Sequence, residues 1–562
     1  MAKPYWQDRG LTVDVAKSVL PAQVDVLIVG GGYTGLSAAR ETAVAGASTL
    51  VLEAGALGAG CSGRNGGQVA YSIKPSLATL TSRHGADKAF AICQEGRAAV
   101  DYLKWLATEQ GLDCGWRQDG LFYGAHTPRH FAAMVRDAAD QPAGLEQNIV
   151  IVPKGEHRRE IDTDFYHGGC LYPDDASVDP MRLLLALLRR AQVAGATLLE
   201  HCPALSIKPR AEGFEVMTPQ GPVRAGKVLI ATNGYSGPVS SWHRRRVIPI
   251  GSYQIATEAL GVDKVRALIP NGRNIVDSRR VVVYYRPSTD GERIIFGGRA
   301  ALSEQDPSAC TQRLKSMLTQ VLPQLGETRI EYTWVGWVAY TFDTMPHLGQ
   351  HEGVYYCMGY CGQGVPTAPY FGQRIGQQMV GRSEGRTALD DLPFPTRPYY
   401  FGTPWFLAPH GGEIESGTSD IAELIAGQDY SLFCFEGLKP YGENRGLHIT
   451  SHRFDQPQCI AMTSVRDVVV GVHGCMGEAQ IFVGGLDAEL ANGLAIHLKD
   501  AGFTVISDGH PYPGRHPLNI CNRGATGRGA QLEITYDLRA REFRERIAAA
   551  VRTAVAERLR RA

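Results

Sequence analysis

The chain carries no excess of charge, because 57 Lys and Arg residues balance 57 Asp and Glu residues among its 562 positions. Proteins that bind nucleic acid or an anionic membrane surface usually present a surplus of basic residues, so neither partner is expected. No stretch reaches the roughly 18 consecutive apolar residues that a membrane-spanning helix requires. The opening residues 1–8 also lack the apolar run of a secretory signal peptide. We therefore expect a cytoplasmic protein whose partners are small molecules.

The 12 cysteines form neither a Cys-x-x-Cys pair nor a compact framework. This distribution argues against a disulfide-stapled fold and favours reduced thiols. Internal repeats and low-complexity tracts are missing as well. The composition, with 44% hydrophobic and 20% charged residues, is typical of globular proteins, and the length predicts two or three domains.

Strands and helices alternate in the first part of the chain. Residues 24–29 and 49–52 read as buried strands with a helix between them near 34–46, and 227–231 read as another strand. Between about 275 and 340 the pattern changes to short alternating strands, such as those at 281–285 and 294–296. This change predicts an antiparallel sheet over a pocket.

A second module is predicted after residues 385–405, which are rich in proline and aromatic residues. We place the domain boundary there, with one domain at 1–405 and another at 406–562, where strand–helix alternation restarts. The final segment, 542–562, predicts one amphipathic helix. Its apolar face is formed by Phe543, Ile547, Val551, Val555 and Leu559.

The first strand runs directly into a glycine-rich turn that is typical of dinucleotide binding. Gly30 permits the tight turn, Gly32 lets the backbone approach a pyrophosphate, and Gly35 lets helix and strand pack closely. Tyr33 and Thr34 then open a helix whose N-terminus faces the phosphates. Glu53, at the end of the next strand, is placed to accept hydrogen bonds from ribose hydroxyls.

Two further glycine-rich segments favour FAD over NAD. A long loop at 58–68 is suited to lie against an isoalloxazine ring, and a turn at 359–365 leads into a second helix whose positive end would face the ring. The cofactor-binding residues predicted in these segments are Ser62, Arg64, Asn65, Gly66, Gly67, Gln68, Gly359, Gly362, Gly364 and Val365.

These segments resemble the D-amino-acid-oxidase-like family of FAD enzymes over roughly residues 24–405. The stretches 62–68, 231–235, 296–299 and 343–347 look most like its gamma-glutamylputrescine oxidase branch. The resemblance implies non-dissociating FAD, an amine or amino-acid substrate and O2 as electron acceptor. An NAD(P)H-dependent flavin reductase is the alternative for this module.

Substrate contacts are predicted at Tyr285, Arg286 and Trp334. Arg286 is suited to make a bidentate contact with a substrate carboxylate. For Tyr285 and Trp334, a position in the core is as well supported as contact with the substrate. His347 is expected to pack beside the flavin loop and not to act as a base. No residue marks a covalent flavin link, since Cys61 and Cys357 read as packed cysteines.

The second module carries the residue types of a zinc hydrolase. His410 and a carboxylate a few residues on, Glu413 or Glu415, follow an apolar segment, and His473 ends a second buried strand. Zinc hydrolases commonly use a His, a carboxylate and a distant His, leaving one position open for water. Glu533 lies between apolar residues in a later strand, where burial would raise its pKa and suit it to proton transfer.

These residues resemble the poly-gamma-glutamate hydrolase family over about 408–562, including the stretches 434–437, 447–451, 473–475 and 519–524. The resemblance implies a zinc carboxypeptidase-like fold. By position it implies zinc ligands His410, Glu415 and His473, the general base Glu533, and Arg523 for a substrate carboxylate.

The junction departs from the family, because residues 399–407 replace the strand expected before His410 and look like the end of the oxidase. The sequence therefore leaves open that the hydrolase has lost its first strand. A further open alternative is that the second module is a degenerate, metal-free binding module.

The complete expectation is an α/β protein with two catalytic modules. An FAD-binding Rossmann-like domain with an antiparallel-sheet substrate domain is followed by a separate α/β zinc-hydrolase domain. Both resembled families handle gamma-glutamyl amides, so we expect FAD-dependent oxidation of a gamma-glutamylputrescine-like amine, joined to zinc-dependent cleavage of gamma-glutamyl amides.

Overall fold

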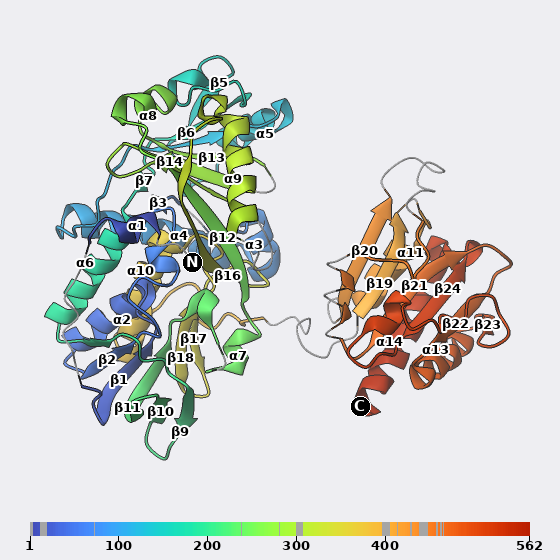
Figure 1. Ribbon diagram of the computed structural model, residues 1–562. Helices are drawn as coiled ribbons and strands as arrows, with labels where there is room; N and C mark the ends of the chain where they lie inside the picture. The colour runs from blue at the N-terminus through green and yellow to red at the C-terminus, as the bar shows by residue number, and fades with distance from the viewer. Residues whose placement is uncertain are drawn as a thin grey trace. The chain divides into compact units, whose positions relative to one another are not determined.

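The computed structural model describes residues 4–11, 19–71, 73–237, 239–279, 282–298, 307–395, 405–412, 414–427, 430–437, 448–456, 459–460, 463–464 and 466–561. Contacts within the chain divide it into two compact units, Met1–Pro395 and Thr396–Ala562, which Figure 1 shows in blue to yellow and in orange to red. The predicted boundary at 405/406 stays a prediction, because residues 396–404 lie outside the described residues.

The first unit contains a sheet of the predicted nucleotide-binding type. Its strands follow the order β17-β18-β11-β1-β2-β8, and β1 pairs in parallel with both β2 and β11. Every side chain of β2 is buried, as expected for a parallel sheet covered on both faces. The strands are β1 (Gln23–Val29), β2 (Thr49–Leu52), β8 (Thr197–Leu199), β11 (Gly221–Ile230), β17 (His347–His351) and β18 (Val354–Met358), with β10 (Phe214–Thr218) paired to β11 and β9 (Ser206–Pro209) paired to β10.

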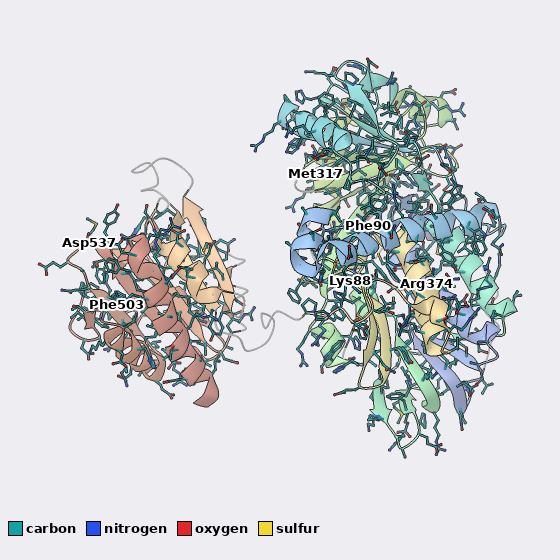
Figure 2. All side chains as sticks on the ribbon, turned by 180° about the vertical axis from the view of Figure 1, so that it is seen from behind. Lys88, Phe90, Met317, Arg374, Phe503 and Asp537 are labelled. Atoms are coloured by element: carbon teal, nitrogen blue, oxygen red, sulfur yellow. The ribbon has the colours of Figure 1, made fainter. Side chains whose placement is uncertain are left out.

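Long helices pack beside this sheet. Helix α2 (Tyr33–Val44) lies against α10 (Gly364–Met379), and α10 in turn contacts α4 (Ala86–Thr108). Figure 2 shows α4, which carries Lys88 and Phe90, crossing beside α10, which carries Arg374. Residues from both ends of the first unit therefore meet at one side of the nucleotide-binding sheet.

The second sheet of the first unit is almost entirely antiparallel, as predicted, with strand order β16-β12-β15-β14-β13-β4-β6-β5. Its one parallel pair joins β13 to β4. The strands are β4 (Leu121–Gly124), β5 (Val150–Pro153), β6 (Gly168–Tyr172), β12 (Ile248–Thr257), β13 (Asn274–Asp277), β14 (Val283–Pro287), β15 (Ile294–Gly298) and β16 (Ile330–Tyr340). A small ladder of β3 (Gln68–Val69) and β7 (Ala176–Ser177) completes the strands of this unit.

The described part of the first unit contains further helices. They are α1 (Tyr5–Asp8), α3 (Leu77–His84), α5 (Pro128–Ala139), α6 (Pro180–Val193), α7 (Ser241–Arg244), α8 (Val262–Leu268) and α9 (Pro307–Val321). None of the helices in the described parts of the chain is both long enough and apolar enough to cross a bilayer.

The second unit is built on a six-stranded sheet of order β20-β19-β21-β24-β22-β23. Its strands are β19 (Trp405–Gly412), β20 (Ser431–Gly437), β21 (Val469–Cys475), β22 (Ile481–Gly485), β23 (Val505–Ile506) and β24 (Ala530–Thr535). The strand leading into His410 is thus present as β19, between β20 and β21, so the possibility of a lost first strand is wrong. Residues 405–407 start this strand and do not end the oxidase.

The helices in the described part of the second unit include α11 (Thr418–Ala426), α13 (Ala488–Asp500) and α14 (Arg541–Arg561). The apolar face predicted for the last helix is confirmed, because Ile547, Val551 and Val555 are fully buried in the core, with Phe543 and Leu559 packed at its margin. Figure 2 labels Phe503, whose ring packs edge-on against Phe543 at the start of α14. This core supports the edge of the sheet where β19, β21 and β24 end.

Candidate functional site

The glycine turn of the first unit has the geometry that its sequence predicts. Gly30 has a φ of +109°, and a side chain at Gly35 would overlap the carbonyl oxygen of Gly30. The two oxygens of the Glu53 carboxylate accept hydrogen bonds from the backbone N–H groups of Gly31, at 2.9 Å, and Gly55, at 3.1 Å. The turn therefore holds the acidic residue beside the start of α2.

A cavity of about 830 Å³ opens at this turn, at the large end of the range of roughly 300–1,000 Å³ for ligand sites. It extends from the nucleotide-binding sheet to strands β4, β6, β12, β13 and β14 of the antiparallel sheet. The predicted cofactor residues that line it are Gly30, Gly32, Tyr33, Thr34, Glu53, Ser62, Arg64, Asn65, Gly66, Gln68, Gly362, Gly364 and Val365. Gly35, Gly67 and Gly359 lie behind the wall and shape its turns.

The loop at 61–68 is held in place by its own amide and hydroxyl groups. The Asn65 side chain donates to the carbonyl of Ser62 at 3.0 Å and accepts from the N–H of Gly67 at 2.8 Å. The Ser62 hydroxyl accepts from the N–H of Tyr33 at 3.1 Å, which ties the loop to the first residue of α2. Gly67 has a φ of +67°, so the chain turns there in a conformation that glycine favours.

A second helix N-terminus meets the first at the cavity. Helix α10 starts at Gly364, and the hydroxyl of Tyr360, in the turn before it, shares a hydrogen bond of 2.6 Å with the Thr34 hydroxyl of α2. The Asn233 side chain accepts from the N–H of Gly359, where φ is +88°. Two positive helix ends thus face one cavity, which favours an electron-rich or anionic ligand.

The residues present fit FAD. Buried polar atoms of three cavity-lining side chains, Arg64 Nε, Gln68 Nε2 and Gln254 Oε1, have no hydrogen-bond partner among the described residues, so they are available to a ligand. The turn at 30–34 and Glu53 would hold the phosphates and ribose, and the segments 61–68 and 362–365 would hold the ring. The bound flavin supplies the chemistry of hydride acceptance.

Among the predicted substrate contacts, Tyr285 does not line the cavity. Its side chain is 1% exposed, stacks on Phe296 and shares a 2.8 Å hydrogen bond with the Tyr166 hydroxyl. The preceding residue, Tyr284, points to the opposite face of β14 and lines the cavity, with its hydroxyl bonded to Ser252 at 2.8 Å. Tyr284 is therefore the tyrosine of this strand that a substrate can touch.

Arg286 also lies outside the cavity wall. Its guanidinium donates to the carbonyl of Val178 at 2.8 Å and covers the ring of Trp6. Burial lowers the pKa of Arg286 to about 10, with Asp179 opposing that effect. The cationic side chains that do line the cavity, among the described residues, are Arg64 and Lys74.

Trp334 and His347 are packed side chains. Trp334 is 2% exposed and donates to the carbonyl of Arg64 at 2.9 Å, so it supports the flavin loop from behind. His347 bonds to Asp343 at 3.0 Å and stacks on Phe394. Burial raises the pKa of the Cys61 thiol to about 11, which keeps it protonated and unreactive at neutral pH.

In the second unit, the three residues predicted as metal ligands converge. One side-chain ligand atom each from His410, Glu415 and His473 lies within 4.8 Å of the other two. The Nδ1 atoms of the two histidines are 3.3 Å apart, and Glu415 Oε1 is 3.2 Å from His410 Nδ1. Glu413 lies outside the described residues.

Hydrogen bonds fix the outward nitrogens of both histidines. His410 Nε2 donates to the carbonyl of Ile449, and His473 Nε2 bonds to the Ser451 hydroxyl at 3.2 Å. His410 is held from outside through Nε2, so its other ring nitrogen, Nδ1, is the atom that faces His473 and Glu415. Metal-binding histidines typically have such a partner on the second nitrogen.

Electrostatics keep Glu415 ionised and His473 neutral. Burial alone would raise the pKa of Glu415, but hydrogen bonds with His410 and His448 hold it well below its usual value. Burial lowers the pKa of His473 to about 3, against the attraction of Glu415. An ionised carboxylate and neutral imidazoles are the protonation states that bind metals.

Glu533 lies on β24, directly opposite His473 on β21. Its carboxylate accepts a 2.7 Å hydrogen bond from the Gln531 amide. Burial, followed by repulsion from Glu415, raises the pKa of Glu533 to about 8. A carboxylate whose pKa is raised in this way can accept a proton near neutral pH and release it again.

The remaining charged residues near this site differ from expectation. Arg523 donates to three backbone carbonyls, those of Leu518, Phe454 and His452, so it joins two loops, and its role toward a substrate carboxylate stays a prediction. Sequence reasoning missed His448, which stacks on His410 and bonds to Glu415 at 3.0 Å.

Sequence reasoning also missed Arg539, which lies beside Gly474 and donates to the carbonyl of Ser416 at 2.9 Å. His448 belongs to one of the stretches that resemble the hydrolase family, whereas no sequence pattern singles out Arg539.

Comparisons with known proteins agree with the division into two modules of different families. The family model for FAD dependent oxidoreductases matches residues 25–378, and that for poly-gamma-glutamate hydrolases matches residues 403–559. Gamma-glutamylputrescine oxidoreductase of Escherichia coli (strain K12) is 30% identical over 322 residues, which cover 57% of this chain and 75% of that protein.

The UPF0714 protein YndL of Bacillus subtilis (strain 168) is 43% identical over 136 residues, which are 24% of this chain and 53% of that protein. Among solved structures, glycine oxidase from Geobacillus kaustophilus superimposes with a TM-score of 0.56 and 21% identity, covering 67% of this chain and 99% of that chain. At that identity the likeness shows the fold alone.

The two-sheet fold and its glycine-lined cavity define a flavin-dependent oxidoreductase. The chain belongs to the FAD dependent oxidoreductase family and is related to gamma-glutamylputrescine oxidoreductase, with a poly-gamma-glutamate hydrolase domain following in the same chain. Both parts belong to enzyme families.

Proposed function

We propose that the first module oxidises the amine of a gamma-glutamylated amine and that the second hydrolyses a gamma-glutamyl amide with the help of zinc. The observation that carries the proposal is the joining, in one chain, of a flavin cavity related to gamma-glutamylputrescine oxidoreductase and a His–Glu–His cluster in a poly-gamma-glutamate hydrolase domain. We keep the proposed module boundary near residue 405, where β19 of the second module begins.

In the oxidoreductase the residues bind, orient and exclude water. Substrate enters between the flavin-facing loop and Tyr284, where Tyr123 and Tyr172 also line the cavity. The amine loses two electrons and two protons to give an imine, which water hydrolyses to an aldehyde and ammonia. O2 takes up the two electrons and two protons and is released as hydrogen peroxide.

In the hydrolase we assign zinc to His410, Glu415 and His473. Three protein ligands with one open position are typical of catalytic zinc sites, and zinc makes a water molecule more acidic and polarises a carbonyl. Glu533 takes the proton of the attacking water and passes it to the leaving amine nitrogen. Convergence of the two histidine Nδ1 atoms, with both Nε2 atoms held from outside, supports this assignment.

An anaerobic reduction experiment tests the first half. Gamma-glutamyl-1,4-diaminobutane should bleach the flavin absorbance of the purified protein, whereas NADH should leave it unchanged. Bleaching by NADH with no response to amines would instead support a flavin reductase.

Metal analysis of the same protein tests the second half, with about one zinc per chain expected. A degenerate binding module would hold no metal and would release no glutamate from gamma-glutamyl amides.

A further inference from the structure

Asp175 is a buried carboxylate in the wall of the flavin cavity, and neither the sequence patterns nor the proposed chemistry accounts for it. Its side chain is 8% exposed and lines the cavity. Among the described residues it takes part in no ion pair, and the hydrogen bond found for its carboxylate comes from the backbone N–H of Tyr71. Burying a carboxylate without a cation costs stability, which functional sites tolerate more often than the rest of a protein.

The surroundings of Asp175 suit an organic cation. Tyr71, Tyr123 and Tyr172 line the same cavity. Aromatic faces attract ammonium groups, and a carboxylate supplies the charge that such a group needs. Burial raises the pKa of Asp175 to about 7, partly offset by the Tyr71 hydrogen bond, so a bound cation would restore full ionisation.

Asp175 is separated from the loop at 61–68, which would face the flavin, by its position in the β3–β7 ladder. Ala176 pairs with Val69 in the β3–β7 ladder, so Asp175 lies opposite Ala70, two residues past Gln68. Two residues of extended chain span roughly 7 Å. Tyr123 of β4 and Tyr172 of β6, which line the same cavity, belong to the antiparallel sheet.

We propose that the Asp175 carboxylate binds the ammonium group of the substrate that is not oxidised, so that the site selects amines carrying a second positive charge. The proposal rests on the proposed amine oxidation and names a specificity residue for it. A carboxylate beside the reacting nitrogen would favour the protonated amine, which cannot give up a hydride. A carboxylate that lies away from the reacting nitrogen instead binds the other end of the substrate and does not favour protonation of the reacting amine.

Two substrates of the same length test the proposal. Gamma-glutamyl-1,4-diaminobutane carries a terminal amine, a carboxylate and an α-ammonium group, whereas N-(4-aminobutyl)glutaramate has hydrogen in place of the α-ammonium group. Anaerobic flavin reduction and steady-state peroxide release are measured for both, on the flavin-loaded full-length protein. The unaltered protein should favour the first compound in kcat/KM by about 10-fold or more, the size of one lost charge-assisted contact.

Asp175→Asn keeps the shape of the side chain and its bond to Tyr71 but removes the charge. The Asp175→Asn substitution should raise KM for the α-ammonium compound by roughly 10- to 100-fold. It should change KM for the compound without the α-ammonium group by less than about 3-fold. Asp174→Asn is the matched control, because Asp174 is the adjacent, exposed carboxylate. It should keep the preference of the unaltered protein.

Three outcomes overturn the proposal. The first is an unaltered protein that oxidises both compounds equally well, a result that needs no variant. The second is an Asp175→Asn protein with normal flavin content that loses activity equally toward both. The third is flavin that stays oxidised with either compound in the unaltered protein, which refutes the proposed amine oxidation itself as well.

Discussion

His473 and Glu533 lie opposite one another on the parallel neighbours β21 and β24 of the second unit. Strand pairing alone therefore brings a proposed zinc ligand and the proposed general base together, although 60 residues separate them in the sequence. His410 reaches the same edge from β19, the neighbour of β21 on its other side. Three adjacent strands thus place both proposed histidine ligands and the proposed base at one edge of the sheet.

Replacing Glu533 with Gln tests the role of the base. Gln keeps the shape and the hydrogen-bonding reach of Glu but accepts no proton, so hydrolysis of gamma-glutamyl amides should fall on the order of 100-fold or more. Metal content and thermal stability should stay normal. Because the ionised form of Glu533 is the active one, kcat/KM of the unaltered protein should rise with pH and level off above the pKa of that carboxyl.

Burial and repulsion from Glu415 raise the pKa of Glu533 to about 8, and a bound cation nearby would lower it. The rise with pH should disappear in Glu533→Gln. Glu542→Gln, at an exposed position of α14, is the matched control and should hydrolyse normally. Hydrolysis by Glu533→Gln at a normal rate would exclude Glu533 as the base.

His410→Ala and His473→Ala should each lose zinc, because three protein ligands are the usual minimum at a catalytic zinc site. Metal content by mass spectrometry is the measurement, and flavin content should be unchanged. His497→Ala removes a histidine of the same unit that pairs with Glu557 instead, and it should retain the metal. Full zinc occupancy in both ligand variants would refute the assigned ligand set.

Gly32→Val should abolish flavin retention. A Cβ atom at Gly32 would lie 2.8 Å from Ser62 Oγ, and the larger side chain would fill space needed by the pyrophosphate. Flavin absorbance per protein is the measurement. Gly237→Val is the control, because Gly237 also lines the cavity but a Cβ atom there has no neighbour closer than 4.0 Å. A fully loaded yellow Gly32→Val protein would contradict the assignment of this turn.

Arg286→Ala should weaken the fold more than substrate recognition. The substitution removes the hydrogen bond to the Val178 carbonyl and the guanidinium packed over the Trp6 ring, which should lower the free energy of unfolding by about 1–3 kcal/mol. Any change in KM should be similar for amines with and without a carboxylate. Lys74→Ala is the comparison, since Lys74 lines the cavity, and it should raise KM selectively for carboxylate-bearing amines. A carboxylate-selective loss in Arg286→Ala would restore Arg286 as the recognition residue.

Much of the fold was predictable because local patterns and tertiary packing agree. The turn from Gly30 to Gly35 follows a buried strand and precedes a helix, and the structure has β1 and α2 at these places. The convergence of His410 and His473 could be anticipated in the same way, since parallel strands end at one edge of a sheet. Their outer hydrogen bonds to Ile449 and Ser451 depend on a loop that no strand pattern describes.

Side-chain direction was the harder problem. Residues 281–285 form a continuous run of apolar and aromatic residues, so no alternation shows that Tyr284 and not Tyr285 faces the cavity. Asp174 and Asp175 look equivalent in sequence, yet the first is exposed and the second is buried. The role of Arg523 depends on carbonyl groups from two loops that meet only in the folded chain.

Product analysis of a single substrate tests the central claim, two catalytic sites for gamma-glutamyl amides in one chain. Gamma-glutamyl-1,4-diaminobutane is incubated in air with flavin- and zinc-loaded protein, and the products are identified by mass spectrometry. The account predicts both the aldehyde of the oxidised terminal amine and free glutamate, with only glutamate lost in Glu533→Gln and only the aldehyde lost in Gly32→Val. Two results would contradict the account: an unaltered, fully loaded protein that forms neither product, or a single variant that loses both the aldehyde and the free glutamate.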